Sequence, residues 1–304
     1  MQAPHLRAVP EPPPEPASGR TSWLQLLRIE VDSHLVDFFE EKKRETGAIS
    51  PPTLELVDAI EALTMRGGKR LRPAVAAAGY RCVRPGHGMD RLVELSASLE
   101  LLQSYLLIHD DWMDGDEVRR GGPAVHTTLQ RSHRDAHLGS ALGVLAGDLA
   151  SAYSWELFLG APYPTRAWPR ATSMFLQVQK EVYCGQQLDL TGDADVARMH
   201  ALKTTSYSVR GPLLLGALLG SPSESQLRAL SDWAGPIGEA FQIRDDLLGA
   251  LGSPDSTGKP GMDLPHGKVS SVLAEARRSI GRAQREPVEA IVGRLDVEHR
   301  ELME

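Results

Sequence analysis

The chain has 304 residues, of which 41% are hydrophobic, 24% charged and 5% aromatic, and its formal net charge is −7. An acidic protein of this kind is ordinary for a globular fold but argues against a nucleic-acid partner, because a surface that binds a phosphate backbone is normally basic. No apolar run is long enough to span a bilayer, and two unpatterned cysteines, Cys82 and Cys184, favour a soluble, cytoplasmic protein over a disulfide framework.

The N-terminal segment differs in composition from the rest of the chain. Residues 1–20 contain six prolines and almost no apolar residues, which predicts a disordered leader ahead of one domain at 21–304. From Ser22 onward, apolar residues recur at the spacing of three to four that is typical of helices, and no alternating strand of convincing length follows. The fold class is therefore predicted to be all-α: a single-domain bundle of long helices around a central cavity, whose active site is built from facing helices. The predicted helices cover about 22–47, 53–65, a stretch from Pro73, 89–113, 134–160, 165–190, 194–220 with a kink at Pro212, 224–250 and 269–300, with a loop at 253–267.

An acidic stretch at 109–121 directly follows an apolar run and is the strongest functional signal in the chain. It holds five acids and two arginines within eleven residues. On a helix, Asp114 shares one face with Asp110 and Asp111, which lie four and three residues before it. Magnesium relieves the repulsion between such carboxylates, since it binds oxygen ligands and is usually held by one or two carboxylates plus substrate phosphates. Arg119 and Arg120 would then donate to phosphate oxygens.

Taken alone, this cluster is equally well explained as a solvated helix end. A second acidic pair, Asp245 and Asp246, again ends an apolar helical segment, far along the chain. Two such elements facing each other across a bundle could hold one diphosphate between metal ions. The pair of motifs favours a metal-dependent site over two unrelated acidic surfaces.

Several basic and polar groups complete the set of candidate residues. The glycine-rich segment 67–73 lacks the spacing of a nucleotide phosphate loop, but it places Lys69, Arg70 and Arg72 in one anion patch, separate from Arg119 and Arg120. Two patches beside two acidic sites suggest two anionic substrates, only one of them bound through metal. Other candidates have plain alternatives, as a polar pair satisfied inside the core or as solvated surface charges: Gln186 with Asp189, Lys203 with Thr204, and the loop lysines Lys259 and Lys268.

Six motifs occur in one order: GGKRLRP from Gly67, QxxxLxHDDWMDxDxxRRGxP from Gln103, GQxLDL, KT, FQIRDDLLG, and TGKPGxDLxxGK ending at Lys268. This ordered set, which covers about two-thirds of the chain, resembles the trans-isoprenyl diphosphate synthases of the polyprenyl synthetase family.

The resemblance implies the all-helical prenyl-synthase fold, a homodimer, and three Mg²⁺ ions per site, with Mn²⁺ as a possible substitute. It implies head-to-tail condensation of isopentenyl diphosphate with an allylic diphosphate. The implied metal-binding residues are Asp110, Asp111, Asp114, Asp189, Asp245 and Asp246. The implied contacts to the allylic diphosphate are Arg119, Lys203, Thr204, Gln242, Lys259 and Lys268. The implied contacts to isopentenyl diphosphate are Lys69, Arg70, Arg72, Gln103 and Arg120.

The residues before the first aspartate motif set product length in this family. Tyr105 lies five residues before Asp110, and the smaller Leu106 lies four before it. One aromatic at the deeper position, with no insertion inside the motif, resembles the geranylgeranyl pattern. A second aromatic four residues before Asp110 would favour the farnesyl product, which is the alternative.

Two departures from the family pattern matter. Gly249 stands where many members have a third aspartate, and the tail after Asp246 is short. The alternatives are therefore weak activity or a regulatory subunit of a heteromeric synthase. A class I terpene cyclase would share the first motif, but the pair Asp245–Asp246 and the basic Lys69–Arg70 argue against it.

Overall fold

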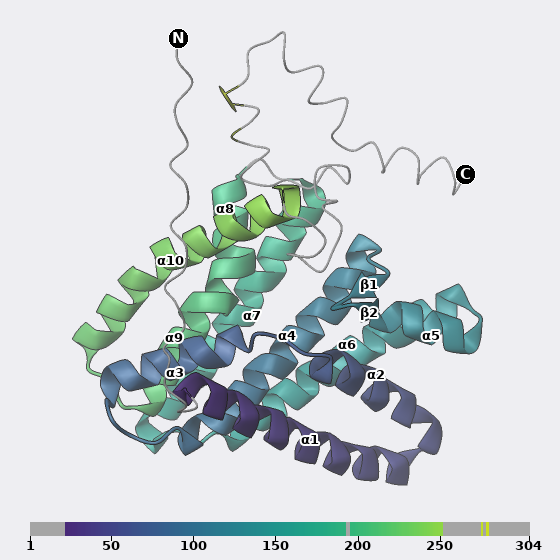
Figure 1. The fold of residues 1–304 in the computed structure, drawn as a ribbon, viewed down its shortest axis with the longest axis horizontal. Helices are drawn as coiled ribbons and strands as arrows, with labels where there is room; N and C mark the ends of the chain where they lie inside the picture. Colours follow the sequence, from purple (N-terminus) through teal and green to yellow (C-terminus); the bar gives the residue numbers. More distant parts are fainter. Residues whose placement is uncertain (1–21, 193–194, 252–274, 276–277, 280–304) are drawn as a thin grey trace.

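The fold is a bundle of long α-helices with one short hairpin (Figure 1). The computed structural model describes residues 22–192 and 195–251, together with 275, 278 and 279. The predicted leader, the 253–267 loop and nearly all of the 269–300 helix lie outside these residues. The elements, in chain order, are α1 (Trp23–Ile49), α2 (Leu54–Met65), α3 (Leu71–Val83), α4 (Val93–Asp114), β1 (Val118–Arg119), β2 (Gly122–Pro123), α5 (Val125–His133), α6 (Ala136–Gly160), α7 (Trp168–Thr191), α8 (Val196–His200), a π-helical segment (Ala201–Arg210), α9 (Gly211–Leu219) and α10 (Glu224–Leu251).

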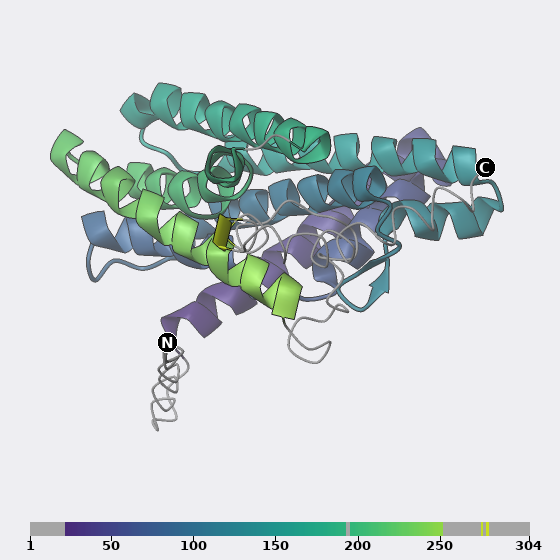
Figure 2. The ribbon, with the colours of Figure 1, turned by 90° about the horizontal axis from the view of Figure 1, so that it is seen from above.

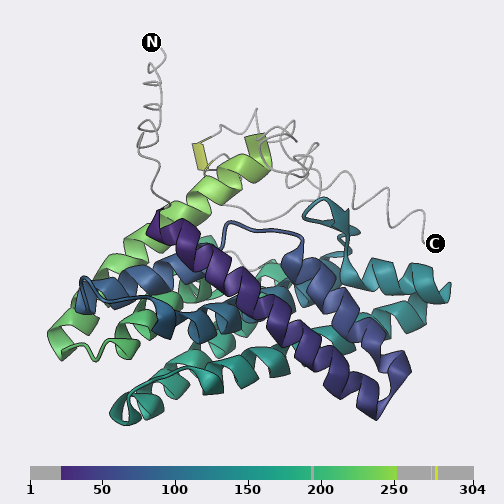
Figure 3. The ribbon, with the colours of Figure 1, turned by 60° about the horizontal axis from the view of Figure 1, so that its bottom comes forward.

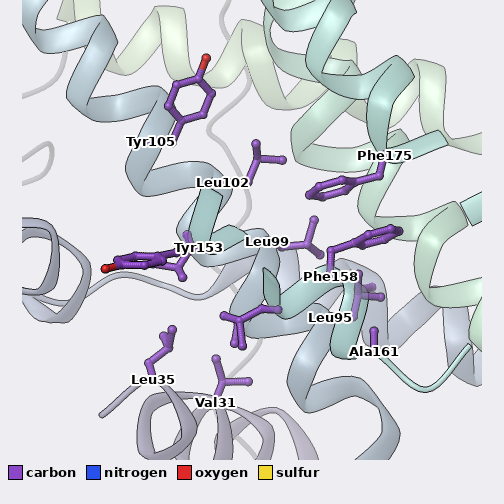
Figure 4. Packing of buried hydrophobic residues seen from close by; sticks show 14 of the residues in the cluster. Val31, Leu35, Leu95, Leu99, Leu102, Tyr105, Tyr153, Phe158, Ala161 and Phe175 are labelled. Atoms are coloured by element: carbon purple, nitrogen blue, oxygen red, sulfur yellow. The ribbon is translucent and has the colours of Figure 1, made fainter. Parts of the chain in front are cut away.

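Helix α4 lies at the centre of the core, because all of its residues from Leu95 to Tyr105, polar as well as apolar, are buried. Leu95, Leu99 and Leu102 are almost fully buried, and Figure 4 shows them along one side of α4, facing Phe158 and Phe175. The rings of Phe158 in α6 and Phe175 in α7 stack with their centroids 4.2 Å apart. Burying each such side chain contributes roughly 1.5–3 kcal/mol. The C-terminal end of α4 is therefore held in place by a helix that packs against its neighbours along its length.

The other helices cover α4. Helix α1 runs obliquely across the bundle and packs on α2, α3 and α4 (Figure 3). Helix α6 packs along α4 and α5, and α9 packs on α3. Helix α10 runs obliquely to α6 and α7 and packs against the π-helical segment (Figure 2). This arrangement brings the C-terminal parts of α4, α7 and α10 to one end of the bundle.

The structure corrects several predicted boundaries. Helix α3 begins at Leu71, two residues before Pro73, which fits the first helical turn because the N–H groups there have no helical partner. The predicted 134–160 helix is α6, and a separate helix, α5, precedes it; Asp135 caps α6 by accepting a hydrogen bond from the Leu138 N–H (3.0 Å). No helix among the described residues is both long and apolar enough to cross a bilayer.

The predicted 194–220 helix departs from α geometry before Pro212. Over Ala201–Arg210 the chain is π-helical, and the Gly211 N–H donates to the carbonyl of Ser206, five residues back. Pro212 has no N–H to continue the α pattern, and its ring crowds the preceding turn. The kink predicted at Pro212 is therefore replaced by a π-helical segment, which is wider than an α-helix, directly before the proline.

A short hairpin, which the sequence did not predict, follows α4. Val118 pairs with Pro123 and Arg119 with Gly122. The two linking residues, Arg120 and Gly121, have φ values of 52° and 72°, as a tight two-residue hairpin turn requires. The turn folds the chain back over the end of α4, so that both arginines stay near the aspartates.

Candidate active site

The first aspartate motif lies at the C-terminal end of α4. The helix ends at Asp114 because Gly115 adopts a left-handed conformation, and the Gly115 N–H donates to the Asp111 carbonyl. Asp110 and Asp114 are half-buried, and Asp111 is fully buried. Carboxylates at a helix C-terminus face the negative end of the helix dipole. This position therefore favours cations that bind between these side chains.

Arg119 supplies one cation from the hairpin. Its Nε donates to Asp111 Oδ1 (2.5 Å), and its Nη2 donates to Asp116 Oδ2 (3.2 Å) and Asp110 Oδ2 (3.5 Å). Burial lowers the pKa of Arg119, but these carboxylates outweigh burial and raise it. One guanidinium thus gathers three carboxylates of the acidic stretch.

Lys203 supplies a second cation from the π-helical segment. Its Nζ donates to Asp189 Oδ2 on α7 (2.5 Å) and to Asp110 Oδ1 on α4 (3.2 Å). Burial lowers the pKa of Lys203, but the two carboxylates outweigh burial and raise it, so the ammonium stays charged. Three elements that are distant in sequence therefore meet at one charged group.

Two glycines allow the π-helical segment to come this close to its neighbours. A Cβ on Gly185 of α7 would lie 2.3 Å from the backbone N of Lys203, and a Cβ on Gly238 of α10 would lie 2.2 Å from Cγ2 of Thr205. Real Cβ atoms do not approach other atoms so closely. The segment that carries Lys203 and the half-buried Thr204 is therefore held between α7 and α10 at glycine contacts.

The second aspartate motif is on α10. Asp246 is buried, accepts a hydrogen bond from Gln242 Nε2 (2.7 Å), and lies 3.6 Å from His200 Nε2. Burial raises the pKa of the more exposed Asp245, against the influence of Arg244 and of the nearby Lys69. The second motif thus faces the basic segment before α3.

Arg70, one of the predicted contacts to substrate, is buried among carboxylates. Its Nη1 lies 2.6 Å from Glu100 Oε2, its Nε donates to Asp32 Oδ1 (2.8 Å), and its Nη2 donates to the Thr64 carbonyl (3.2 Å). Its side chain is 4% exposed. These contacts give Arg70 a structural role, and its predicted substrate contact stays a prediction.

The remaining predicted anion-binding groups lie around Arg70. Arg72 stacks on the Tyr207 ring (4.3 Å) and donates to Ser208, and Arg120 donates to the Leu63 carbonyl. Burial lowers the pKa of Arg120, and the neighbouring arginines lower it further. Among the described residues, the buried Arg72 Nε and Gln103 Oε1 have no hydrogen-bond partner, which is typical of groups that bind a ligand. Lys69 is exposed beside them.

A cavity of about 320 Å³ opens beside the first motif. It has Asp110 and Lys203 in its wall, and Tyr105 and Leu106 line it as well. Its wall is mostly apolar, so it suits a hydrocarbon group whose charged end lies near Lys203. Its other lining residues are Leu107, His109, Met113, Val182, Tyr183, Gln186, Gln187, Leu190 and Tyr207.

A larger groove of about 530 Å³ lies between α7, α9 and α10. Its lining includes Arg170, Arg210 and Arg228, but none of the predicted site residues. Arg170 and Arg210 pair with Glu224 and Glu181. The smaller cavity is lined by predicted site residues, among them Asp110 and Lys203, so we take it as the candidate site.

The donor set suits a hard divalent cation. The candidate ligands on α4, α7 and α10 are all carboxylates, which supply the oxygen atoms that magnesium prefers. Within the described ranges, no three His, Cys, Asp or Glu side chains form a group that could hold a metal ion unaided. Magnesium is commonly held by one or two carboxylates together with substrate phosphates, so the carboxylates on these three helices are suitable ligands for it.

Sequence reasoning missed some of the residues at this site. His200 contacts Asp246, and burial lowers its pKa. Its position three residues before Lys203 is the signal that could have identified it in the sequence. Tyr183 and Tyr207 line the cavity but read as ordinary helix residues. The predicted contacts Lys259 and Lys268 lie outside the described residues.

Comparison with known proteins points to one family. The family model for polyprenyl synthetases matches residues 54–304. The chain is 31% identical over 262 residues to a short chain isoprenyl diphosphate synthase of Methanothermobacter thermautotrophicus, covering 84% of this chain and 76% of the relative. It is 32% identical over 270 residues to a geranylfarnesyl diphosphate synthase of Aeropyrum pernix, covering 84% and 77%.

A solved structure agrees with these relatives. The geranylgeranyl pyrophosphate synthase of Corynebacterium glutamicum, complexed with isoprenyl diphosphate and magnesium, superposes with a TM-score of 0.82 at 30% identity. The match covers 90% of this chain and 82% of that one. These similar proteins are named for products of different lengths, so similarity alone does not fix the length of the product here.

Proposed function

The chain belongs to the polyprenyl synthetase family and is a short-chain prenyltransferase, and we propose that it condenses isopentenyl diphosphate with an allylic diphosphate to give geranylgeranyl diphosphate. The observation that carries this proposal is Lys203, whose ammonium contacts Asp110 and Asp189 at the mouth of an apolar cavity. A diphosphate bound there would have its hydrocarbon chain directed between α4 and α7.

The reaction needs stabilisation of a departing anion. The allylic carbon–oxygen bond breaks, and the electron pair leaves with the diphosphate. The double bond of isopentenyl diphosphate attacks the allylic carbon, a carbon–carbon bond forms, and a proton is lost to the departing diphosphate. Lys203 and Arg119 are positioned before the reaction to neutralise this anion, which is where fixed charges are most effective.

Magnesium would neutralise the diphosphate further and orient it as a Lewis acid. We propose three ions per site, with Mn²⁺ able to replace them, held by Asp110, Asp111 and Asp114 on one side and by Asp245 and Asp246 on the other, with Asp189 assisting.

The second substrate would bind beside the first. Arg72 belongs to the basic segment, and Arg120 lies close enough to Arg70 and Arg72 for their charges to lower its pKa. Lys69 is exposed at the edge of the segment. Arg72 Nε, a donor without a partner among the described residues, could donate to a phosphate oxygen, whereas Gln103 would have to use its amide Nε2, because its Oε1 can only accept. We assign isopentenyl diphosphate to this position, so that its double bond faces the allylic carbon.

Product length would be set at the deep end of the cavity. Tyr105 is 9% exposed and lines the wall, as does Leu106. In Figure 4, Tyr105 lies at one end of the row of α4 side chains, with its hydroxyl directed away from Phe158. We propose a geranylgeranyl product, with a farnesyl product as the alternative.

We propose that the enzyme works as a cytoplasmic homodimer. Helix α6 presents Leu138 and Leu145 to solvent (40% and 52% exposed), with the partly buried Leu142 and Leu149 between and after them. Their spacing of four, three and four residues makes one apolar stripe on a helix. Such a stripe is typical of an interface between two helices, and a second copy of the same chain would cover it. Both cysteines are free, as in a reducing compartment.

The test is incubation of the purified chain with isopentenyl diphosphate, Mg²⁺ and each allylic primer, followed by sizing of the dephosphorylated products by mass spectrometry. Asp246→Asn should reduce turnover by about 10²–10³-fold, whereas Asp232→Asn, an exposed aspartate on the same helix, should not. A folded wild-type chain that gives no product with any primer would contradict the proposal and support the regulatory-subunit alternative.

A further inference from the structure

Two tyrosine rings on different helices meet in the cavity wall. Tyr105 on α4 and Tyr183 on α7 both line the cavity, with ring centroids 6.2 Å apart and ring planes at 89°. This edge-to-face arrangement is a favourable one for aromatic rings. Burial raises the pKa of Tyr105, and a hydrogen bond with Tyr183 raises it further, so the hydroxyl at this contact stays neutral.

The two rings lie at matching depths below the charged end of the site. Tyr105 lies five residues before Asp110, and Tyr183 lies six before Asp189. At about 1.5 Å per residue, these separations are about 7.5 and 9 Å along the two helix axes. Because Lys203 joins Asp110 to Asp189, the two depths are measured from a common point. The rings therefore approach each other from opposite walls at nearly one level.

A buried amide holds the second ring. Oε1 of Gln179, one turn before Tyr183 on α7, accepts hydrogen bonds from the Tyr183 hydroxyl and from Trp155 Nε1, each at 3.3 Å. Gln179 Nε2 donates to the Phe175 carbonyl (3.3 Å), and the side chain is 6% exposed. With its amide fixed at three points, Gln179 limits the orientations that the Tyr183 ring can adopt.

We propose that Tyr183 is a second residue that determines product length, forming with Tyr105 a two-ring barrier across the cavity, and that Gln179 is a positioning residue for it. The inference rests on the proposed prenyltransferase reaction and deepens it. A growing chain held at Lys203 extends down the cavity until it meets both rings. Neither ring closes the cavity alone, because each comes from one wall.

A simpler interpretation is that Tyr183 is a surface tyrosine, since its side chain is 43% exposed. Against this interpretation, the Tyr183 ring contacts the ring of Tyr105 and its hydroxyl donates to the buried amide of Gln179. Leu176, seven residues earlier on α7, is similarly exposed (45%) but does not line the cavity. It is the matched control.

The experiment compares the products of Tyr183→Ala, Tyr183→Trp and Leu176→Ala with those of the wild type, by mass spectrometry under identical conditions. Steric discrimination by an apolar pocket is worth about 10–200-fold. We expect Tyr183→Ala to raise the ratio of longer to wild-type product by about tenfold or more. Tyr183→Trp should shift the products toward shorter chains, and Leu176→Ala should leave the ratio unchanged.

The role of Gln179 is tested separately. Tyr183→Phe and Gln179→Met each remove the hydrogen bond that orients the ring but keep its volume, so each should give a smaller shift toward longer product. Tyr183→Phe also removes the hydrogen bond between the hydroxyl and Tyr105, so its shift should be the larger one. Adding Gln179→Met to it should shift the ratio no further, because the contact between the hydroxyl and Gln179 is already lost. A purely structural role for Gln179 would lower thermal stability without changing the ratio.

Failure of the inference is distinguishable from failure of the proposed function. If the wild type gives no prenyl product, the proposed function fails. If the wild type gives product and both Tyr183→Ala and Tyr183→Trp give the same lengths at similar turnover, the barrier is overturned while the function stands. Because the two variants act in opposite directions, a folding defect in one leaves the other decisive.

Discussion

Lys203 and Asp189, fourteen residues apart in the chain, lie side by side in the folded protein, with Nζ 2.5 Å from Oδ2. This pair joins the π-helical segment to α7, and the second contact of Lys203, to Asp110, joins both to α4. The charged end of the site is thus assembled from three elements around one ammonium group.

Removing the charge of Lys203 should abolish most of the activity. Lys203→Met leaves Asp110 and Asp189 without their shared cation and takes a positioned charge from the departing diphosphate. We expect turnover to fall by about 10²–10³-fold, measured in steady-state assays at saturating substrates. Lys180→Met, an exposed lysine on α7, is the control and should retain wild-type turnover. Equal turnover in both variants would remove Lys203 from the mechanism.

Adding a methyl group at Gly185 should disturb the site without changing any of its charged side chains. The new Cβ would meet the Lys203 backbone at 2.3 Å, so α7 and the π-helical segment must separate. We expect a loss of about 1–3 kcal/mol in the free energy of unfolding, together with a large loss of activity. Gly47→Ala in α1 is the control: its Cβ would lie 3.7 Å from Leu54 Cδ1, an ordinary contact, and alanine favours helix, so stability should hold or rise.

Arg70 and Lys69 are neighbours with different expected roles. Arg70→Ala leaves the buried Glu100 without its cation, which should cost about 3–5 kcal/mol of folding free energy in urea titrations. Lys69→Ala alters an exposed side chain and should leave stability unchanged, while it raises the KM for isopentenyl diphosphate by about tenfold or more. Unchanged stability in Arg70→Ala would show that its ion pairs contribute little and that substrate binding is its main role.

His34 should make stability depend on pH. A hydrogen bond to Glu94 (3.2 Å) raises the pKa of His34 above 6.5, against the effect of burial. A raised histidine pKa means that the folded state binds the proton more tightly than the unfolded state. The added stability is therefore fully present below pH 6.5 and is lost as the pH rises through the folded-state pKa.

This pH dependence can be checked by urea unfolding of the wild type and of His34→Gln at about pH 6 and about pH 8, two values that span the range in which histidines titrate. The stability difference between the two proteins should shrink at the higher pH. Glu94→Gln removes the partner and should give the same loss of pH dependence. A difference that grows with pH would contradict the assignment.

The α6 stripe should hold the dimer together. Leu145→Glu places a charge in the centre of the proposed interface, so the molecular mass in solution, measured by light scattering, should fall to that of one chain. Ile49→Glu changes a side chain that is 85% exposed at the end of α1, and it should leave the mass unchanged. If light scattering gives the mass of one chain for the wild type as well, the proposed dimer is wrong.

Most of the fold could be predicted from the sequence because the periodicity of its apolar residues is regular. The boundaries of α2, α7 and α10 were predicted to within a few residues. The hairpin after α4 was not, because strands of two residues are too short to show an alternating pattern. Helix α5 was missed because its nine residues include only two apolar side chains, Val125 and Leu129, which are too few to show a helical period.

The sequence singled out the charged residues of the candidate site, but it did not indicate which residues hold them in place or line the cavity. Aspartate pairs at helix ends stand out from the sequence, and so do paired arginines. The burial of Arg70 between Asp32 and Glu100 depends on the packing of α1 and α4, which no local pattern reports. Tyr183 is likewise recognisable only once α7 faces α4 across the cavity.

The π-helical segment also sets limits on insertions and deletions. Each residue of an α-helix turns the chain by about 100°, and a π-helical turn accommodates one extra residue. A single deletion within Ala201–Arg210 that left the π-helical turn in place would rotate α8 and His200 by roughly that angle relative to α9. The histidine would then point away from Asp246. The length of this segment is therefore as specific a requirement of the site as the identity of any side chain in it.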